Sequence, residues 1–115
     1  PGVIYFHGGG WVLGSCETHD DMCAELADQA DVVVVMVDYR LAPEHPHPAQ
    51  LEDSHKVLAW MRSAGRALGI DPTHIIAAGD SAGGQMTAAW WKAARSTAWR
   101  KACGTGACRS CAAWC

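Results

Sequence analysis

The second part of the chain lacks the side chains that enzymes most often use to move protons. Residues 82–115 contain no histidine, aspartate or glutamate, because all six histidines and all twelve acidic residues lie at or before Asp80. Histidine and carboxylate side chains are the usual general acids and bases. A reaction at a residue that follows Asp80 must therefore take its general base from another segment.

Long apolar runs are missing too. No stretch approaches the ~18 consecutive apolar residues of a membrane-spanning helix, and no signal peptide is recognisable. The chain begins at Pro1 and enters a strand pattern almost at once, so we expect it to be part of a longer protein. Its 115 residues fit one domain at most. Localisation stays open, with the cytoplasm as the default expectation.

Segments typical of strands alternate with segments typical of helices. Strands are expected at 3–6, 32–37 and 74–78, which are runs of β-branched or small apolar residues. Helices are expected after Thr18 as the N-cap, over 51–68, and from Ser81 onward. Three prolines keep the segment 38–49 out of regular helix. This β-α-β-α-β-α order predicts an α/β fold with a parallel sheet and right-handed crossovers.

Composition changes abruptly after Ala89. Residues 90–115 hold five of the nine basic residues, four of the six tryptophans and four of the six cysteines, but no Val, Ile, Leu, Met, Phe, Tyr, Asp or Glu. No apolar periodicity persists there beyond about one helical turn. We interpret residues 90–115 as an atypical tail that is out of frame or disordered, since GC-rich genes read in the wrong frame favour Ala, Arg, Gly, Trp and Cys.

The pentapeptide Gly79-Asp80-Ser81-Ala82-Gly83 matches G-x-S-x-G. It lies between a predicted strand and a predicted helix, which is the setting of a nucleophile elbow. Side chains at the two glycine positions would collide with the neighbouring strand and helix. The sharp turn would raise the Ser81 hydroxyl above the sheet edge and aim the Ala82 amide at a reacting carbonyl oxygen. For the pentapeptide alone, a turn of small residues without chemistry is the alternative.

Three glycines follow the first predicted strand, as Gly8-Gly9-Gly10 after His7. Such a backbone can turn its N–H groups toward one point and stabilise an oxyanion, where losing one donor costs about 3–4 kcal/mol. A lone glycine triplet also fits a flexible turn. However, both motifs follow the C-terminal ends of predicted parallel strands, and ligands bind at that edge of such sheets.

Three segments follow one another in a fixed order. They are His7–Trp11 (His-Gly-Gly-Gly-Trp), residues 38–46 (Asp-Tyr-Arg-Leu-Ala-Pro-Glu-His-Pro) and Gly79–Gly84 (Gly-Asp-Ser-Ala-Gly-Gly). Together they resemble the hormone-sensitive lipase-like (family IV) carboxylesterases of the α/β-hydrolase fold. Residues 1–89 would then be the N-terminal part of the catalytic domain. His47 departs from the resemblance, because the family usually has an aromatic or apolar residue there.

The resemblance implies a set of site residues. Ser81 would be the nucleophile, and the amides of Gly8, Gly9 and Ala82 would form the oxyanion hole. The substrates would be small acyl esters, short-chain ones in particular, and no metal or organic cofactor is implied. Structural support of the site is implied for His7, Gly10, Tyr39, Gly79, Asp80 and Gly83.

The family's catalytic order is serine, then Asp or Glu, then histidine, and only the serine is present here. His7 is not expected to act as base, because the glycine-loop histidine of the family points away from the nucleophile. An α/β-hydrolase scaffold without a base is also compatible with a non-catalytic small-molecule receptor. A downstream Asp and a late loop His in the full-length gene would identify an enzyme instead.

Other chemistry is less well supported. The tail cysteines have the spacing C-x4-C-x2-C-x3-C, which partly matches plant-type ferredoxins and also suggests zinc. The tail nevertheless lacks the apolar residues that shape a metal pocket, so we predict no metal. Cys16 and Cys23 are expected to be small buried thiols. The basic, Trp-rich tail contains no recognisable nucleic-acid module, so we expect no nucleic-acid partner.

We predict that the chain, made as written, is essentially inactive, because a serine hydroxyl without a general base is a poor nucleophile. Enzymes that lose triad members keep only ~10³–10⁴-fold acceleration over water. Release of p-nitrophenol from p-nitrophenyl butyrate measures this. Brisk turnover that Ser81→Ala abolishes would contradict the prediction.

The out-of-frame interpretation makes a prediction about the encoding DNA. Beyond codon 89, another reading frame should continue the valine- and leucine-rich pattern of an α/β domain. Translation of the nucleotide sequence in all three frames checks this, and three frames without a strand pattern would rule the interpretation out.

Overall fold

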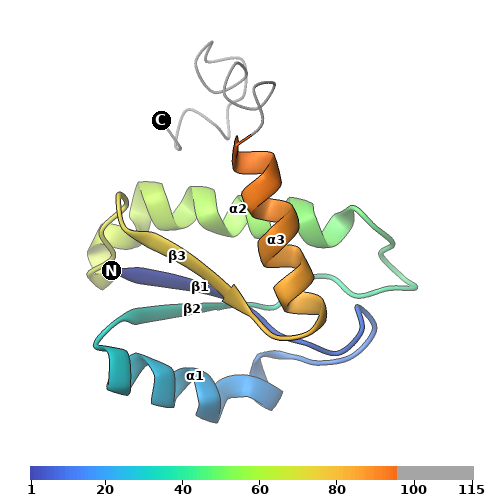
Figure 1. Ribbon diagram of the computed structural model, residues 1–115, viewed down its shortest axis with the longest axis horizontal. Coiled ribbons are helices and arrows are strands. Elements are labelled where there is room, and N and C mark those ends of the chain that lie inside the picture. Colours follow the sequence, from blue (N-terminus) through green and yellow to red (C-terminus); the bar gives the residue numbers. More distant parts are fainter. Residues whose placement is uncertain (96–115) are drawn as a thin grey trace.

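The computed structural model describes residues 1–95, in which strands and α-helices alternate (Figure 1). The elements are β1 (Gly2–Phe6), α1 (Cys16–Ala30), β2 (Val33–Val37), α2 (Ala49–Ala64), the 3-10 helix η1 (Gly65–Leu68), β3 (Ile75–Gly79) and α3 (Ala82–Arg95). The predicted α/β fold and its element order are confirmed.

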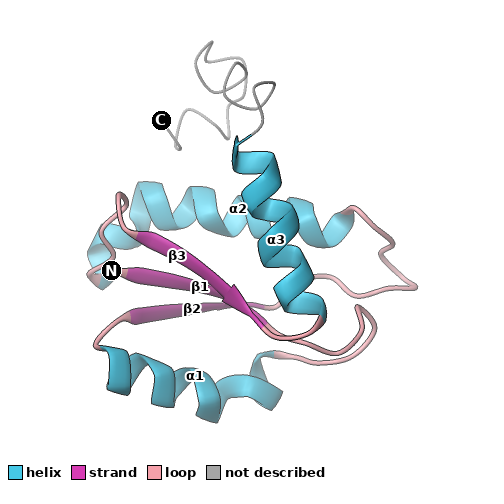
Figure 2. Cartoon of the chain, viewed as in Figure 1, coloured by secondary structure: helices cyan, strands magenta, loops and turns pink. Residues whose placement is uncertain are grey.

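The strands form a parallel sheet in the order β2-β1-β3. Phe6, the last residue of β1, pairs with Val37 of β2 and Gly79 of β3, so the strands end level with one another. The loops that follow β1 and β2 leave the sheet at this same end (Figure 2). α1 lies on one side of the sheet, and α2 and α3 lie on the other (Figure 1). The segments that follow β1, β2 and β3 therefore meet at this end of the sheet.

The hydrophobic core lies between the sheet and the helices. All five residues of β1 are buried, because a strand flanked on both sides and covered on both faces has no contact with water. Burial of each large side chain contributes roughly 1.5–3 kcal/mol of transfer free energy. The core residues are Ile4, Phe6, Val37, Tyr39, Leu58, Met61, Ile70, Met86 and Trp90.

The helix boundaries differ from the sequence prediction at two points. α1 begins at Cys16, so the prediction that Thr18 is the N-cap was wrong. Thr18 lies in the first turn, where its hydroxyl oxygen accepts the Ser15 N–H at 3.1 Å and donates to the Ser15 carbonyl at 2.8 Å. The second predicted helix ends early, since the chain tightens to a 3-10 helix at Gly65. A Cβ at Gly65 would crowd the buried Ile70 at 3.2 Å.

α3 continues past the boundary that we placed at residue 89. It reaches Arg95, and Trp90 packs into the core with 8% of its surface exposed, whereas Trp91 is 55% exposed. The rest of the predicted tail, with its cysteines, lies outside the described residues. The origin of residues 90–115 stays a prediction.

An ion pair fastens the proline-containing loop between β2 and α2. The Arg40 side chain donates from Nε to Asp53 Oδ2 at 2.9 Å, and the Arg40 backbone N–H donates to the same oxygen at 3.0 Å. Partial burial acts to raise the pKa of Asp53, but the hydrogen bonds from Arg40 outweigh it and lower that pKa. The loop that carries Tyr39 is thus tied to the first turns of α2.

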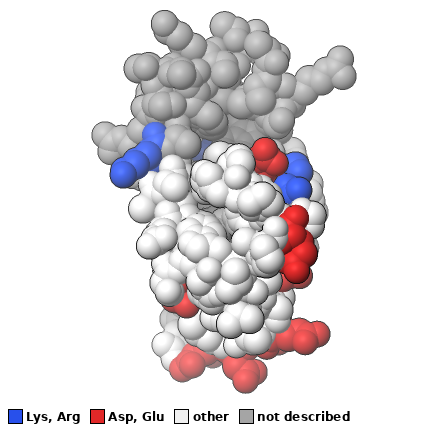
Figure 3. Space-filling model, turned by 90° about the vertical axis from the view of Figure 1, so that its right-hand side faces the viewer, with Lys and Arg blue, Asp and Glu red and all other residues white. Residues whose placement is uncertain are grey.

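Acidic side chains gather at the end of the molecule that α1 forms (Figure 3). Within α1 the acidic residues are Glu17, Asp20, Asp21, Glu25 and Asp28, and the helix contains no Lys or Arg. A surface of this sign repels the phosphate backbone of nucleic acids. Among residues 1–95, no helix is long and apolar enough to cross a membrane.

The core makes a prediction about stability. Leu58 is fully buried and Leu68 is 55% exposed, so Leu58→Ala should lower the free energy of unfolding by about 2–5 kcal/mol. Leu68→Ala is the matched control and should change it by about 0.5 kcal/mol or less. Urea unfolding followed by circular dichroism measures both, and equal effects would contradict the assigned core.

Candidate active site

Ser81 occupies a strained turn between the end of β3 and the start of α3. Its φ angle is +51°, a left-handed conformation that is uncommon for a residue other than glycine and that is often found at active sites. Ser81 is exposed. Ala82 is the first residue of α3, where a backbone N–H has no partner within its own helix. The sharp turn that the sequence predicts is therefore present, with a hydroxyl and a helix-terminal amide side by side.

The glycines of the elbow permit a very close approach of backbones. A Cβ on Gly83 would overlap the carbonyl oxygen of Phe6 and lie 2.9 Å from that of His7. A Cβ on Gly79 would lie 2.6 Å from both the Phe6 carbonyl oxygen and the Gly83 carbonyl carbon. These are the collisions with the neighbouring strand and helix that the sequence predicts. The start of α3 rests directly on the end of β1.

The glycine loop touches the elbow from the side of β1. A Cβ on Gly8 would overlap the Asp80 carboxylate and lie 3.2 Å from the Asp80 carbonyl oxygen. Gly9 and Gly10 have φ angles of +126° and +61°, which glycine adopts at no steric cost. The loop closes on itself through the Leu13 N–H, which donates to the Gly9 carbonyl at 2.9 Å. The two motifs therefore share one edge of the sheet, as predicted.

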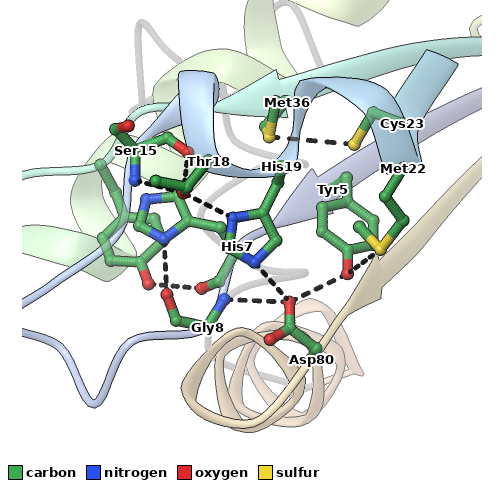
Figure 4. A network of polar contacts seen from close by, with 11 residues as sticks. Tyr5, His7, Gly8, Ser15, Thr18, His19, Met22, Cys23, Met36 and Asp80 are labelled. Atoms are coloured by element: carbon green, nitrogen blue, oxygen red, sulfur yellow. Dashed lines mark hydrogen bonds and ion pairs between the residues drawn. The ribbon is translucent and has the colours of Figure 1, made fainter.

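Asp80 connects the elbow to the glycine loop and to β1 (Figure 4). Its Oδ1 accepts hydrogen bonds from the Gly8 N–H and the Tyr5 hydroxyl, both at 2.9 Å. Burial acts to raise the pKa of Asp80, but these hydrogen bonds and the nearby His19 outweigh it and lower the pKa. Burial, followed by the Asp80 carboxylate, raises the pKa of Tyr5 to about 12, so Tyr5 keeps its proton for this bond.

The Gly8 amide has a different partner from the one that the family resemblance implies. A backbone N–H carries one hydrogen, and that of Gly8 points at the Asp80 carboxylate. In this conformation it is not free to stabilise an oxyanion. Gly8 instead anchors the loop to Asp80, and the oxyanion hole stays a prediction.

His7 and Tyr39 hold the glycine loop from the other side. The two rings stack with centroids 4.3 Å apart and an interplanar angle of 12°. The Tyr39 hydroxyl donates to the His7 carbonyl at 2.6 Å, and His7 Nδ1 lies 2.8 Å from the Gly8 carbonyl. Burial, with a smaller effect of the Asp80 charge, raises the pKa of Tyr39 to about 12. His7 is completely buried.

The two cysteines of the described residues belong to α1. Cys23 is buried and its thiol lies 3.8 Å from the Met36 sulfur, while Cys16 is partly exposed. Burial raises the pKa of both thiols. No group of His, Cys, Asp or Glu in residues 1–95 could hold a metal ion. The four tail cysteines lie beyond that range.

Sequence reasoning missed two residues that reach the elbow, Tyr5 and His19. Tyr5 belongs to an unbroken apolar run, so nothing in the pattern distinguished its hydroxyl from a core ring. His19 follows Thr18 in α1, and no motif links that helix to Asp80. Only the folded backbone brings these side chains to one carboxylate.

Comparison with known proteins gives a consistent result. The family described as alpha/beta hydrolase fold matches residues 3–106. The chain is 53% identical over 88 residues to the esterase LipI of Mycobacterium tuberculosis, covering 76% of this chain and 28% of that protein. It is 50% identical over 95 residues to the carboxylesterase NlhH of the same organism, covering 83% of this chain and 30% of that protein. The chain thus spans less than a third of the length of these relatives.

Solved structures show the same likeness. An esterase from Pyrobaculum calidifontis superposes with a TM-score of 0.79 at 52% identity, over 83% of this chain and 31% of the esterase. A structure described as a bacterial heroin esterase superposes with the same TM-score at 38% identity, over 83% of this chain and 30% of that one.

The backbone contact at Gly83 predicts a large difference between neighbouring glycines. Gly83→Ala should destabilise the fold by about 1–3 kcal/mol, because its Cβ has only backbone atoms to displace. In Gly84→Ala the Cβ would lie 3.3 Å from the Gly79 carbonyl oxygen, so the change should stay below about 1 kcal/mol. The urea concentration at the midpoint of unfolding is measured for both variants. Equal midpoints would contradict the packing described.

Asp80 predicts a pH effect on stability. Its pKa is lower in the fold than in the unfolded chain, so its ionised form stabilises the fold at neutral pH, and this contribution disappears as the pH falls below about 4. Asp80→Asn should therefore lose less stability than the parent between pH 6 and pH 3. With the side chain 46% exposed, the difference should not exceed about 1 kcal/mol. Urea unfolding at both pH values measures it, and an equal loss in both proteins would refute the coupling.

Proposed function

Because the chain belongs to the hormone-sensitive lipase-like family of alpha/beta hydrolases, we propose that it carries the nucleophile half of a carboxylesterase active site. The observation that supports this most strongly is the strained backbone of Ser81, with φ of +51°, in contact with a glycine loop through Asp80 and Gly8. A turn that merely connects a strand to a helix does not need this conformation. The esterase names of the relatives support the same reaction.

The proposed reaction is acyl transfer through Ser81. Its Oγ forms a bond to the acyl carbon of the ester, and its proton passes to a general base. The resulting tetrahedral oxyanion collapses, the bond to the alkoxy oxygen breaks, and the alcohol leaves with that proton. Water then hydrolyses the acyl-serine and restores the hydroxyl. Residues 82–115 contain no His, Asp or Glu, so in this proposal the base comes from another part of a longer protein.

The proposed oxyanion donors are the amides of Gly9 and Ala82. Ala82 follows the nucleophile and begins α3, where the helix dipole also favours negative charge. Gly9 has a positive φ angle, so its peptide group takes an orientation that residues with a side chain rarely adopt. Gly8, with its N–H on Asp80, fixes the peptide that precedes Gly9. Short-chain acyl esters are the substrates that we propose.

The alternative function, a small-molecule receptor on the same scaffold, has no observation in its favour. A receptor gains nothing from a serine held at positive φ, since the strain of about 1–3 kcal/mol opposes folding. The relatives LipI and NlhH are named as esterases.

The test joins this chain to the part that it lacks. Residues 1–89 replace the matching segment of a full-length relative, and hydrolysis of p-nitrophenyl esters of increasing acyl length is measured. We expect an active chimera that prefers acetate and butyrate to long-chain esters. Ser81→Ala should lower kcat by at least ~10⁴-fold. A folded chimera without activity, or one that is indifferent to Ser81→Ala, would refute the proposal.

Gly9→Ala tests the oxyanion donor in the same chimera. Its Cβ would overlap the Leu13 carbonyl and its φ of +126° suits glycine alone, so the amide must move. We expect kcat to fall by about 10²–10³-fold with little change in KM. Gly69→Ala is the matched control, since Gly69 also has a positive φ, of +82°, but lies in the turn after η1. Equal kcat losses in the two variants would contradict the donor assignment.

A further inference from the structure

His19 reaches the nucleophile elbow from α1, although it belongs to none of the motifs discussed above. Its Nε2 lies 3.6 Å from Asp80 Oδ1, and its side chain is only 22% exposed. On its other face its ring lies 5.6 Å, between centroids, from the buried ring of His7. Figure 4 shows the imidazole between the Thr18 hydroxyl and the Asp80 carboxylate. His19 thus contacts Asp80 beside the point where the elbow meets the glycine loop.

The contacts around Thr18 orient the His19 ring. The Thr18 hydroxyl donates to the Ser15 carbonyl at 2.8 Å, and His19 Nδ1 lies 2.8 Å from the same hydroxyl oxygen. With Nδ1 directed at Thr18, the other ring nitrogen, Nε2, faces the Asp80 carboxylate. The imidazole therefore connects the first turn of α1 to the elbow.

The Asp80 carboxylate is open to competition from water. Its side chain is 46% exposed, so water competes for the carboxylate that the Gly8 N–H and the Tyr5 hydroxyl share. Gly8 is anchored to the elbow through this one oxygen. An N–H group of His19 beside Oδ1 would keep the carboxylate turned toward the loop.

We propose that His19 is a positioning residue of this site, which through Nε2 holds the Asp80 carboxylate and, through it, the Gly8 peptide and the glycine loop. The functional meaning of this positioning rests on the proposed esterase function. The contact itself does not, and it can be tested in the 115-residue chain without an ester substrate.

The test is amide hydrogen exchange, followed by NMR, of the Gly8 N–H. In His19→Phe the ring volume remains but the donor is lost, and we expect the protection of the Gly8 amide to fall about fivefold, as for a partly exposed ion pair. Exchange at Ile4, in the centre of β1, reports global opening and should not change. His19→Gln retains an N–H donor and should keep most of the protection. His74→Phe is the matched control, since it removes another His–Asp pair, with Asp71 at 2.8 Å, far along the chain from Gly8.

Three results would overturn the proposal. One is an unchanged Gly8 amide in His19→Phe. A second is a parallel loss at Gly8 and Ile4, which would mean that His19 stabilises the whole fold and does not position the loop. The third is an equal loss in His19→Gln and His19→Phe. None of these results depends on ester hydrolysis, so failure of this proposal and failure of the esterase proposal are distinguishable.

Discussion

The site depends on one steric constraint, which is the contact between the first turn of α3 and the last carbonyl groups of β1. Only a residue without a side chain fits at position 83, where a Cβ would overlap the Phe6 carbonyl oxygen. Because α3 can approach this closely, its N-terminal amide and Ser81 lie beside the loop that continues β1. The parallel register pairs Phe6 with Gly79. It therefore determines that the glycine loop and the elbow start at the same level of the sheet.

The glycine loop is held on two sides, and this compensates for its intrinsic freedom. On one side the Gly8 N–H is bound by Asp80. On the other, Tyr39 stacks on His7 and donates to its carbonyl. Tyr39 in turn belongs to a loop that Arg40 ties to α2 through Asp53. For the oxyanion donors proposed above, this fixation would mean that no reorganisation is needed during the reaction.

The sequence predicted the architecture well, because alternation of apolar runs and amphipathic segments is a property of local pattern. It also predicted that the two glycine motifs share an edge, since parallel strands end on the same side of a sheet. Boundaries were less accurate. Serine and threonine are both good caps, so Ser15 and Thr18 could not be told apart. An apolar period also continues unbroken from α2 into η1.

Partners of individual polar groups could not be predicted. The Gly8 amide could face a ligand or a side chain, and no local pattern says that a carboxylate far along the chain reaches it. The same holds for Tyr5 and His19, which meet Asp80 only because β1 and α1 both border the elbow. The alternation of apolar and amphipathic segments in the sequence predicts the order of strands and helices. The contacts of Asp80 depend instead on the distances between those elements in the fold.

The contacts of Asp80 have a consequence for protein engineering. In the pattern G-x-S-x-G the second position is written as open to any residue, and a directed-evolution library would vary it freely. In this chain the side chain at that position contacts the glycine loop through Gly8, β1 through Tyr5 and α1 through His19. Libraries that randomise residues 5, 19 and 80 together would sample compatible combinations, whereas changing residue 80 alone discards most of them.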